Sequence, residues 1–494
     1  MSRRLYSLEA RDKTGVFLGL AVGELMLVAG GVLLGIVMHL GGAPVALSAV
    51  AVLAGVAVAK LRVAGTPVRE WARVLLAWVV SRLLGRHRWQ ARLPLFSATG
   101  LSEAELPPQL AGLDIVEVSG KGAGFAAVRD CRRGRLTAVL AVRGSEFAGL
   151  DPDAQDSLLG SWGDALGSFA TAGSPISQIG WCDTVAPTDL SWHRSWANQQ
   201  LAARDPAEAS AASYEQLVGE VASYAQVHET TLWVTVDAMC GPGGAGRPHE
   251  RAARQLPAAV EDVTAALDRA GVTTPGPLPV AGVWRLLRSR IDPLDAAMRR
   301  DGEGASLAER LGLVGAHNGG PVALQSAWSH VRLDGSFHRV YWIESWPRRP
   351  VPGDWMSALL TAGESCTITV AYRPIDPHRS QRRIESQLAK LAANRIRKQE
   401  GQRRVTETDH RTEEAVHDLE AELASGHAEY QYLGLVAVPA PSVEELEERC
   451  HRLEQAARAT GLALRRIDGA PEVAWAASLP FGLVEPGLLE LFGV

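Results

Sequence analysis

The sequence predicts an α+β fold in which an N-terminal two-helix transmembrane hairpin precedes a cytoplasmic body of duplicated split βαβ (ferredoxin-like) units. Two observations predict this arrangement. Two long apolar runs, Gly15–Leu40 and Ala43–Leu61, stand back to back near the start of the chain. Beyond residue 92, short apolar strands and amphipathic helices alternate twice in the order of a split βαβ unit.

The two apolar runs predict membrane spans at about 15–40 and 43–61, because a helix needs roughly 20 residues to cross ~30 Å of hydrocarbon. Lys and Arg lie before the first run and after the second, and the turn between the runs has neither. Positive charge marks the cytoplasmic side of a span. We therefore expect a multi-pass protein of the plasma (inner) membrane, in contact with the lipid bilayer, with both termini cytoplasmic.

Small residues recur at four-residue spacing along both runs, a pattern that lets helices approach closely in lipid. They indicate either that the two spans pack on each other or that they form a seam for another membrane subunit. Glu24 is a carboxylate inside the first run, and it has either a functional role or a structural partner. The residues expected at this packing surface are Gly15, Gly19, Gly23, Glu24, Gly31, Gly35 and Gly55.

A basic helix is expected directly after the second run, since Thr66-Pro67 can cap and open a helix. Its apolar stripe includes Trp71 and Trp78, while Arg73 and Arg82 stand elsewhere on it. The pattern is typical of an interfacial helix with Trp at headgroup level. The alternative is a core helix of the first domain. With the two spans it makes up a segment of residues 1–92.

Net charge differs sharply between this segment and the remaining chain. Residues 1–92 hold twelve Lys and Arg against four acidic residues, a balance of +8, so the net charge of −5 leaves about −13 for the remainder. That balance argues against a nucleic-acid-binding body, which needs a concentrated basic face. The five cysteines form no CxxC pair, so neither a zinc site nor a disulfide framework is indicated.

The length predicts two or three domains, and the repeated alternation divides the body into residues 93–293 and 294–494. In the first part we expect a strand near 176–185, a helix over about 207–230 with His228 at its end, and a strand at 232–237. In the second part we expect strands at 367–372 and 432–438. Ser442 with Glu445 forms a capping box for the helix that follows.

A long charged helical arm is expected at 377–426, with basic residues in its first half and acidic residues in its second. One interpretation is a hairpin, broken near Gly401, whose basic and acidic helices pair with each other. The other is a projecting arm that docks a partner; a straight helix of that length would span about 70 Å. The residues expected to dock a partner are Arg382, Arg383, Arg397, Arg404, Glu413 and Glu414.

No motif for catalysis stands out. The turn around Lys121 fails as a phosphate-binding P-loop, because Ile115 and Gly122 occupy positions that require Gly and Ser or Thr. The histidines have no metal-ligand spacing such as H-E-x-x-H. We therefore expect no catalytic residue, no cofactor, no metal site and no enzymatic activity.

Three features resemble one family. They are the two-span anchor with its Arg-rich helix, the segment Arg285–Pro293 (RLLRSRIDP), and Trp328 with Tyr341–Pro347 (YWIESWP) followed by the strand Thr367–Arg373. Together they resemble actinobacterial conjugative-element membrane proteins that fuse a PrgI-like anchor to the N-terminal, non-ATPase half of the type IV secretion ATPase.

The resemblance implies a non-catalytic structural and coupling subunit of a type IV secretion-like (conjugative DNA transfer) machine. Its implied partners are a separate P-loop secretion ATPase, other membrane channel subunits and further copies of itself, without direct nucleic-acid binding. Two alternatives remain open on the sequence. One is a membrane-anchored enzyme of unknown chemistry, and the other is a nucleotide-responsive regulator without a P-loop.

Overall fold

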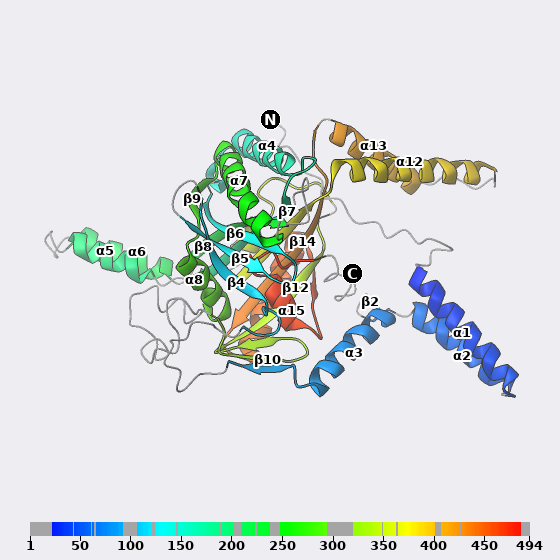
Figure 1. Ribbon diagram of the computed structural model, residues 1–494. Coiled ribbons are helices and arrows are strands. Elements are labelled where there is room, and N and C mark those ends of the chain that lie inside the picture. The colour runs from blue at the N-terminus through cyan, green and yellow to red at the C-terminus, as the bar shows by residue number, and fades with distance from the viewer. Residues whose placement is uncertain are drawn as a thin grey trace.

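The structure is a computed structural model, shown in Figure 1. It describes residues 22–42, 44–60, 62–63, 66–91, 106–120, 124–144, 147–187, 190–201, 209–222, 225–237, 248–293, 320–347, 349–361, 364–400, 407–424 and 426–485.

The body is a mixed α/β domain built on one 13-stranded sheet. Its main path runs β3-β10-β11-β12-β14-β13-β7-β8-β6-β5-β4, with β15 paired to β12 and β9 paired to β6, and every pairing is antiparallel. The strands are β3 (Arg88–Gln90), β4 (Leu113–Val118), β5 (Phe125–Asp130), β6 (Arg135–Arg143), β7 (Ile176–Pro187), β8 (Gln226–Asp237), β9 (Thr273–Pro277), β10 (Ala323–Ser326), β11 (Val331–Leu333), β12 (Ser336–Ser345), β13 (Cys366–Pro374), β14 (Tyr430–Ala440) and β15 (Ala463–Arg466). A separate two-stranded ribbon joins β1 (Arg62–Val63) to β2 (Thr66–Pro67).

The sheet consists of two halves with the same topology. The first half has the strand order β9-β6-β8-β7, and the second half has the order β15-β12-β14-β13. In each half a further strand pair continues the sheet, β5 and β4 from β6, and β11 and β10 from β12. In chain order this is the split βαβ arrangement. The halves join where β7 pairs antiparallel with β13, with Cys182 opposite Thr369. The body is therefore one continuous sheet with an internal pseudo-twofold relationship at the β7–β13 seam.

Helices occupy equivalent places in the two halves. The first half has α4 (Pro152–Phe169), α5 (Ser191–Leu201), α6 (Ala209–Ala222), α7 (Pro248–Arg269) and α8 (Val280–Ile291), with a short 3-10 turn at Phe147–Gly149. The second half has α11 (Ser357–Leu360), α12 (Pro377–Glu400), α13 (Glu407–Ala424), α14 (Val443–Ala459) and α15 (Pro471–Ala477). N-cap side chains determine where two of these helices begin. Asp151 accepts from two amides of the first turn of α4, and Ser442 accepts from the amide of Glu445 in α14.

Three buried clusters hold these layers together. One lies between the first half of the sheet and helices α4 and α7, and one between the second half and α11 and α14. The third is shared by both halves and includes side chains of α8 and α15, among them Val283 and Trp475. Close packing is tightest at Gly180, where an added Cβ would overlap the ring of Trp233.

The expected transmembrane hairpin is wrong. No helix in the described part of the chain is long and apolar enough to cross a membrane. The helices in this region, α1 (Val22–Leu40) and α2 (Val45–Lys60), have 19 and 16 residues. Over these described residues, at 1.5 Å per residue, they are about 28 and 24 Å long, below the ~30 Å of a hydrocarbon core. The same finding contradicts the predicted multi-pass location in the plasma (inner) membrane with cytoplasmic termini.

Candidate functional site: the projecting helical arms

Two helical hairpins leave the body at equivalent points of its two halves. The α5–α6 hairpin follows β7 and precedes β8, and the α12–α13 hairpin follows β13 and precedes β14. In Figure 1 they project from opposite sides of the body, α5–α6 at the left and α12–α13 at the upper right. We call them the first arm and the second arm.

The second arm is a hairpin of two helices that pack on each other. Arg395 of the basic helix α12 lies 3.3 Å from Glu413 of the acidic helix α13. This is the paired form of the charged segment, and it extends from the body in Figure 1. The helices thus pair with each other and also project, while docking of a partner stays a prediction.

The base of the second arm is tied firmly to the sheet. Asp376 accepts hydrogen bonds from the amides of His378 and Arg379, at 3.0 and 3.2 Å, which caps α12. Glu429, at the start of the returning chain, accepts from Ser380 and forms an ion pair with Arg383. Ser380 is buried and the Glu429 side chain is only 10% exposed, so this one contact at the base of α12 is shielded from solvent.

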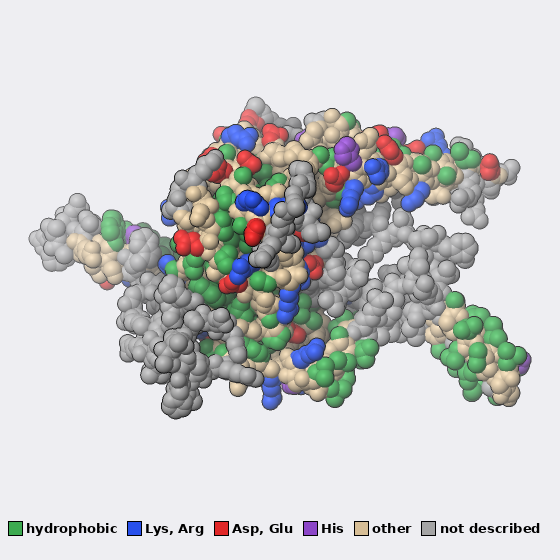
Figure 2. Space-filling view, in the orientation of Figure 1, with side chains coloured by type: hydrophobic (Ala, Val, Ile, Leu, Met, Phe, Trp, Pro, Cys, Tyr) green, Lys and Arg blue, Asp and Glu red, His purple; other side chains and the backbone are tan. Residues whose placement is uncertain are grey.

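The six residues expected to dock a partner divide by environment. Arg382 and Glu414 are exposed. Arg383 and Glu413 are used within the arm itself, in the pairs with Glu429 and Arg395. The side chain of Arg397 and all of Arg404 lie outside the described residues. Figure 2 shows Lys, Arg, Asp and Glu side chains spread along this arm at the upper right.

The first arm carries an aromatic cluster that the sequence analysis missed. His193 Nε2 and the hydroxyl of Tyr214 are 2.5 Å apart and join α5 to α6. Trp196 stacks on His193 with ring centroids 5.7 Å apart, and its side chain is 51% exposed. Leu217 on α6 is 55% exposed. The duplicated topology was the signal that could have located this arm, because an insertion between β13 and β14 implies an equivalent insertion point between β7 and β8.

The basic helix after α2 is α3 (Val68–Leu83), and it packs on the second half of the body. Trp71 stacks on Trp328 at 6.0 Å, and Trp78 meets the same ring edge-on at 5.3 Å. The guanidinium of Arg82 lies 4.8 Å from the centre of the Trp78 ring. These tryptophans thus contact protein, and the side chain of Arg73 lies outside the description.

The predicted small-residue surface lies partly on the α1–α2 hairpin. The two helices pack against each other. Gly35 is buried, while Gly31 and Gly55 are half-buried. Gly23 and Glu24 belong to α1, but their surroundings are not described, and Gly15 and Gly19 lie outside the described residues.

Within the ranges that the structure describes, no group of three or more His, Cys, Asp or Glu side chains could hold a metal ion. Burial does shift individual groups. It lowers the pKa of His338 to about 4 and raises the pKa of the Cys366 thiol to about 12. Hydrogen bonding to Asp183 raises the pKa of His228. These side chains lie in strands of the body, and none of them belongs to a helix of the two arms.

No family model matches this chain, and no curated protein matches it.

Proposed function

We propose that this chain is a non-catalytic assembly and coupling subunit of a type IV secretion-like, conjugative DNA-transfer machine, and that it docks a separate P-loop ATPase. The observation that carries the proposal is the second arm, a charged helical hairpin anchored at its base by Asp376 and Glu429. A helix pair fixed at one end and projecting at the other offers a partner a long surface without disturbing the body.

The chemistry of the second arm suits recognition by charge. Arg382 lies exposed on α12, and Glu414 lies exposed on α13. Charges of both signs along one hairpin select a partner with the complementary pattern and speed its encounter. Ile396, near the far end of α12, adds an apolar side chain that is 56% exposed, and apolar contacts of this kind supply affinity at the centre of an interface.

The identity of the partner rests on the resemblance carried by Arg285–Pro293 and Tyr341–Pro347. In the proteins that this chain resembles, the nucleotide-hydrolysing part of the ATPase is a separate chain. The coupling role follows from the continuous sheet, because a load applied to an arm passes through the hydrogen bonds between β13 and β7 to the rest of the body.

Affinity purification of the tagged full-length chain from its native host tests the proposal. We expect a P-loop ATPase and other transfer-channel subunits to co-purify in near-stoichiometric amounts. The double variant Arg382→Glu/Glu414→Lys should lose the ATPase. The matched control is Arg458→Glu, an exposed change on α14, which is not part of the arm. This variant should retain the ATPase. Recovery of the wild-type chain without an ATPase would overturn the proposal.

A further inference from the structure

A cavity lies at the seam between the two halves of the body. Its walls come from β7, β13 and β14 on the sheet side and from the ends of α8 and α15. Arg290, Thr184, Thr367, Ser365, Pro439 and Trp475 are among the residues that line it. The space holds about 30 Å³ and is partly open to solvent. A single water needs roughly 10–15 Å³ on this measure, so the cavity has room for a group of two oxygen atoms.

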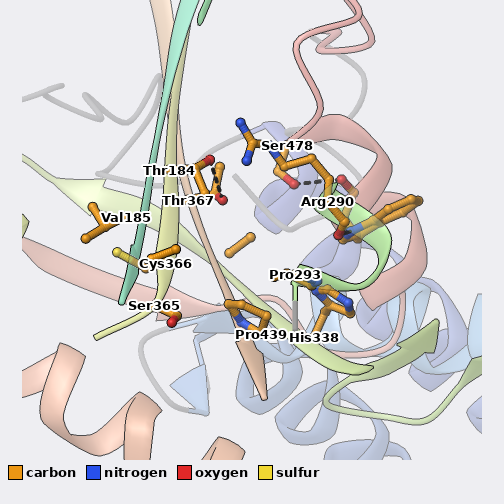
Figure 3. Close-up of a pocket in the computed structure, with 13 residues that line it drawn as sticks. Thr184, Val185, Arg290, Pro293, His338, Ser365, Cys366, Thr367, Pro439 and Ser478 are labelled. Atoms are coloured by element: carbon orange, nitrogen blue, oxygen red, sulfur yellow. Dashed lines mark hydrogen bonds between the residues drawn. The ribbon is translucent and has the colours of Figure 1, made fainter. Parts of the chain in front are cut away.

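Arg290 is the charged group of this cavity, and it is almost completely buried. Its side chain is 5% exposed. The residue lies in the last turn of α8, where its carbonyl accepts from Trp475 Nε1 at 3.4 Å and the neighbouring Ile291 carbonyl accepts from His338 at 2.8 Å. The backbone of Arg290 is thus fixed against α15 and β12. Figure 3 shows its side chain extending toward the strands that carry Thr184 and Thr367.

The guanidinium of Arg290 is only partly satisfied. Its Nη1 lies 3.7 Å from Glu229 Oε2, a distance too long for a hydrogen bond. Its Nε and Nη2 are buried and have no hydrogen-bond partner among the residues that the structure describes. Buried donors are rarely left unpaired, because each one loses its hydration without compensation. Nε and Nη2 also stand on the same edge of the planar group, so their hydrogens point in parallel.

Two parallel N–H groups on one edge match two oxygens held by one atom, which is the fork geometry of arginine with an oxyanion. On the strand side, the hydroxyls of Thr184 and Thr367 are 3.0 Å apart and add polar surface to the cavity. The side chains of Pro439 and Trp475 make other parts of the wall apolar.

We propose that this cavity is a binding site for a monovalent carboxylate, held by Nε and Nη2 of Arg290. A carboxylate has the two coplanar oxygens that the free edge of the guanidinium requires, and it adds only one negative charge beside the ion pair of Arg290 with Glu229. A phosphate would bring a second negative charge into a partly apolar cavity, beside an arginine that already pairs with Glu229, at a large desolvation cost. The carboxylate belongs either to a free small molecule or to an acidic side chain of a protein. This site is separate from the arms and does not depend on the proposed function.

The test is titration of the full-length chain in carboxylate-free buffer at constant ionic strength. Acetate is the probe for a small molecule, and N-acetyl-aspartate N-methylamide is the probe for a side chain. Binding is followed by ligand NMR line broadening. We expect saturable binding of at least one probe, and no competition from chloride at equal concentration. Tighter binding of acetate assigns the site to a small molecule, and tighter binding of the aspartate analogue assigns it to a protein side chain.

Variants locate the binding. Arg290→Lys keeps the charge but removes the two-donor edge, and it should weaken binding roughly tenfold or more. Arg290→Met removes both the charge and the two-donor edge. Arg458→Met, an exposed change on α14, should leave binding unchanged. Circular dichroism confirms that each variant is folded, and Thr184→Val provides a second variant if Arg290→Met does not fold. Absence of saturable binding, or equal binding by wild type and Arg290→Lys, would overturn the proposal and leave the cavity as a site for water alone.

Discussion

Arg339 and Glu447 form a bidentate ion pair that connects α14 to the second half of the sheet. Nη1 and Nη2 of Arg339 donate to the two carboxylate oxygens of Glu447, at 2.8 and 2.5 Å. The guanidinium is buried, whereas 58% of the Glu447 side chain is exposed. The carboxylate therefore serves mainly to satisfy a cation that the fold has removed from water.

Glu447→Gln should lower the free energy of unfolding by about 1–2 kcal/mol, less than for a fully buried pair because water reaches the glutamate. The hydrogen bond from Arg339 holds the pKa of Glu447 below its usual value. The stabilisation is thus present above the ordinary glutamate pKa and is lost as pH falls through the lower, folded-state pKa. Urea denaturation at several pH values measures both effects. Glu448→Gln, on the exposed side of the same helix, is the control, and an equal loss in both variants would contradict the prediction.

His338 should make stability depend on pH. Its ring is fully buried and donates to the Ile291 carbonyl, and burial lowers its pKa to about 4. The unfolded chain, with a histidine pKa near 6.5, therefore binds the proton first as pH falls. Stability should be complete above about pH 6.5 and fall by about 3 kcal/mol by pH 4. The difference in stability between wild type and His338→Asn, measured from pH 4 to pH 7, should shrink toward acid. A pH-independent difference would count against this account.

Gly180→Ala should destabilise the body strongly. Gly180 lies in β7 opposite Trp233 of β8, and an added methyl group would overlap the indole ring and lie 2.6 Å from the Val370 carbonyl oxygen. Overpacking of this kind costs about 1–3 kcal/mol or more. Gly160→Ala in α4 is the control, because its Cβ would meet nothing within 4 Å, and it should stabilise by about 0.5–1 kcal/mol. Thermal denaturation separates the two, and equal melting temperatures would refute the overlap.

Glu429→Gln should loosen the second arm at its base and leave the sheet intact. Glu429 accepts from Ser380 and pairs with Arg383, so the change removes the charge that both contacts use. Hydrogen exchange should accelerate across the first turns of α12 and stay unchanged in β7 and β8. Glu385→Gln, also on α12 and exposed, should not have this effect. Equal exchange in both variants would show that Glu429 does not anchor the helix.

The sequence reveals the alternation of the elements better than their pairing. The strand expected at 432–438 lies within β14, and Ser442 caps α14 as its spacing indicates. The helix expected over 207–230 ends earlier, at Ala222, and His228 lies in β8 beside Asp183. Apolar residues at helical spacing also fit a strand whose two faces are both covered, so periodicity alone did not separate the two.

The candidate sites were hidden for a related reason. Pairing of β7 with β13 joins residues nearly 190 positions apart, and a single sequence carries no signal of such a contact. The cavity at that seam gathers Arg290 from one half with Thr367 from the other. Arg290 was visible only as part of a segment resembling a family. The apolar runs at 15–40 and 43–61 were misleading, because no helix in the described part of the chain is long and apolar enough to cross a membrane.

The internal pseudo-symmetry has a mechanical consequence. Both arms are inserted at corresponding turns, and the strands between those turns are neighbours in one hydrogen-bonded sheet. β7 and β13 are hydrogen-bonded directly to each other, so no flexible loop separates the strands from which the two arms leave. Two partners bound to the two arms of a single copy would therefore be held at a distance that the spacing of the strands determines. A single copy of the chain would then be enough to set the distance between two bound components.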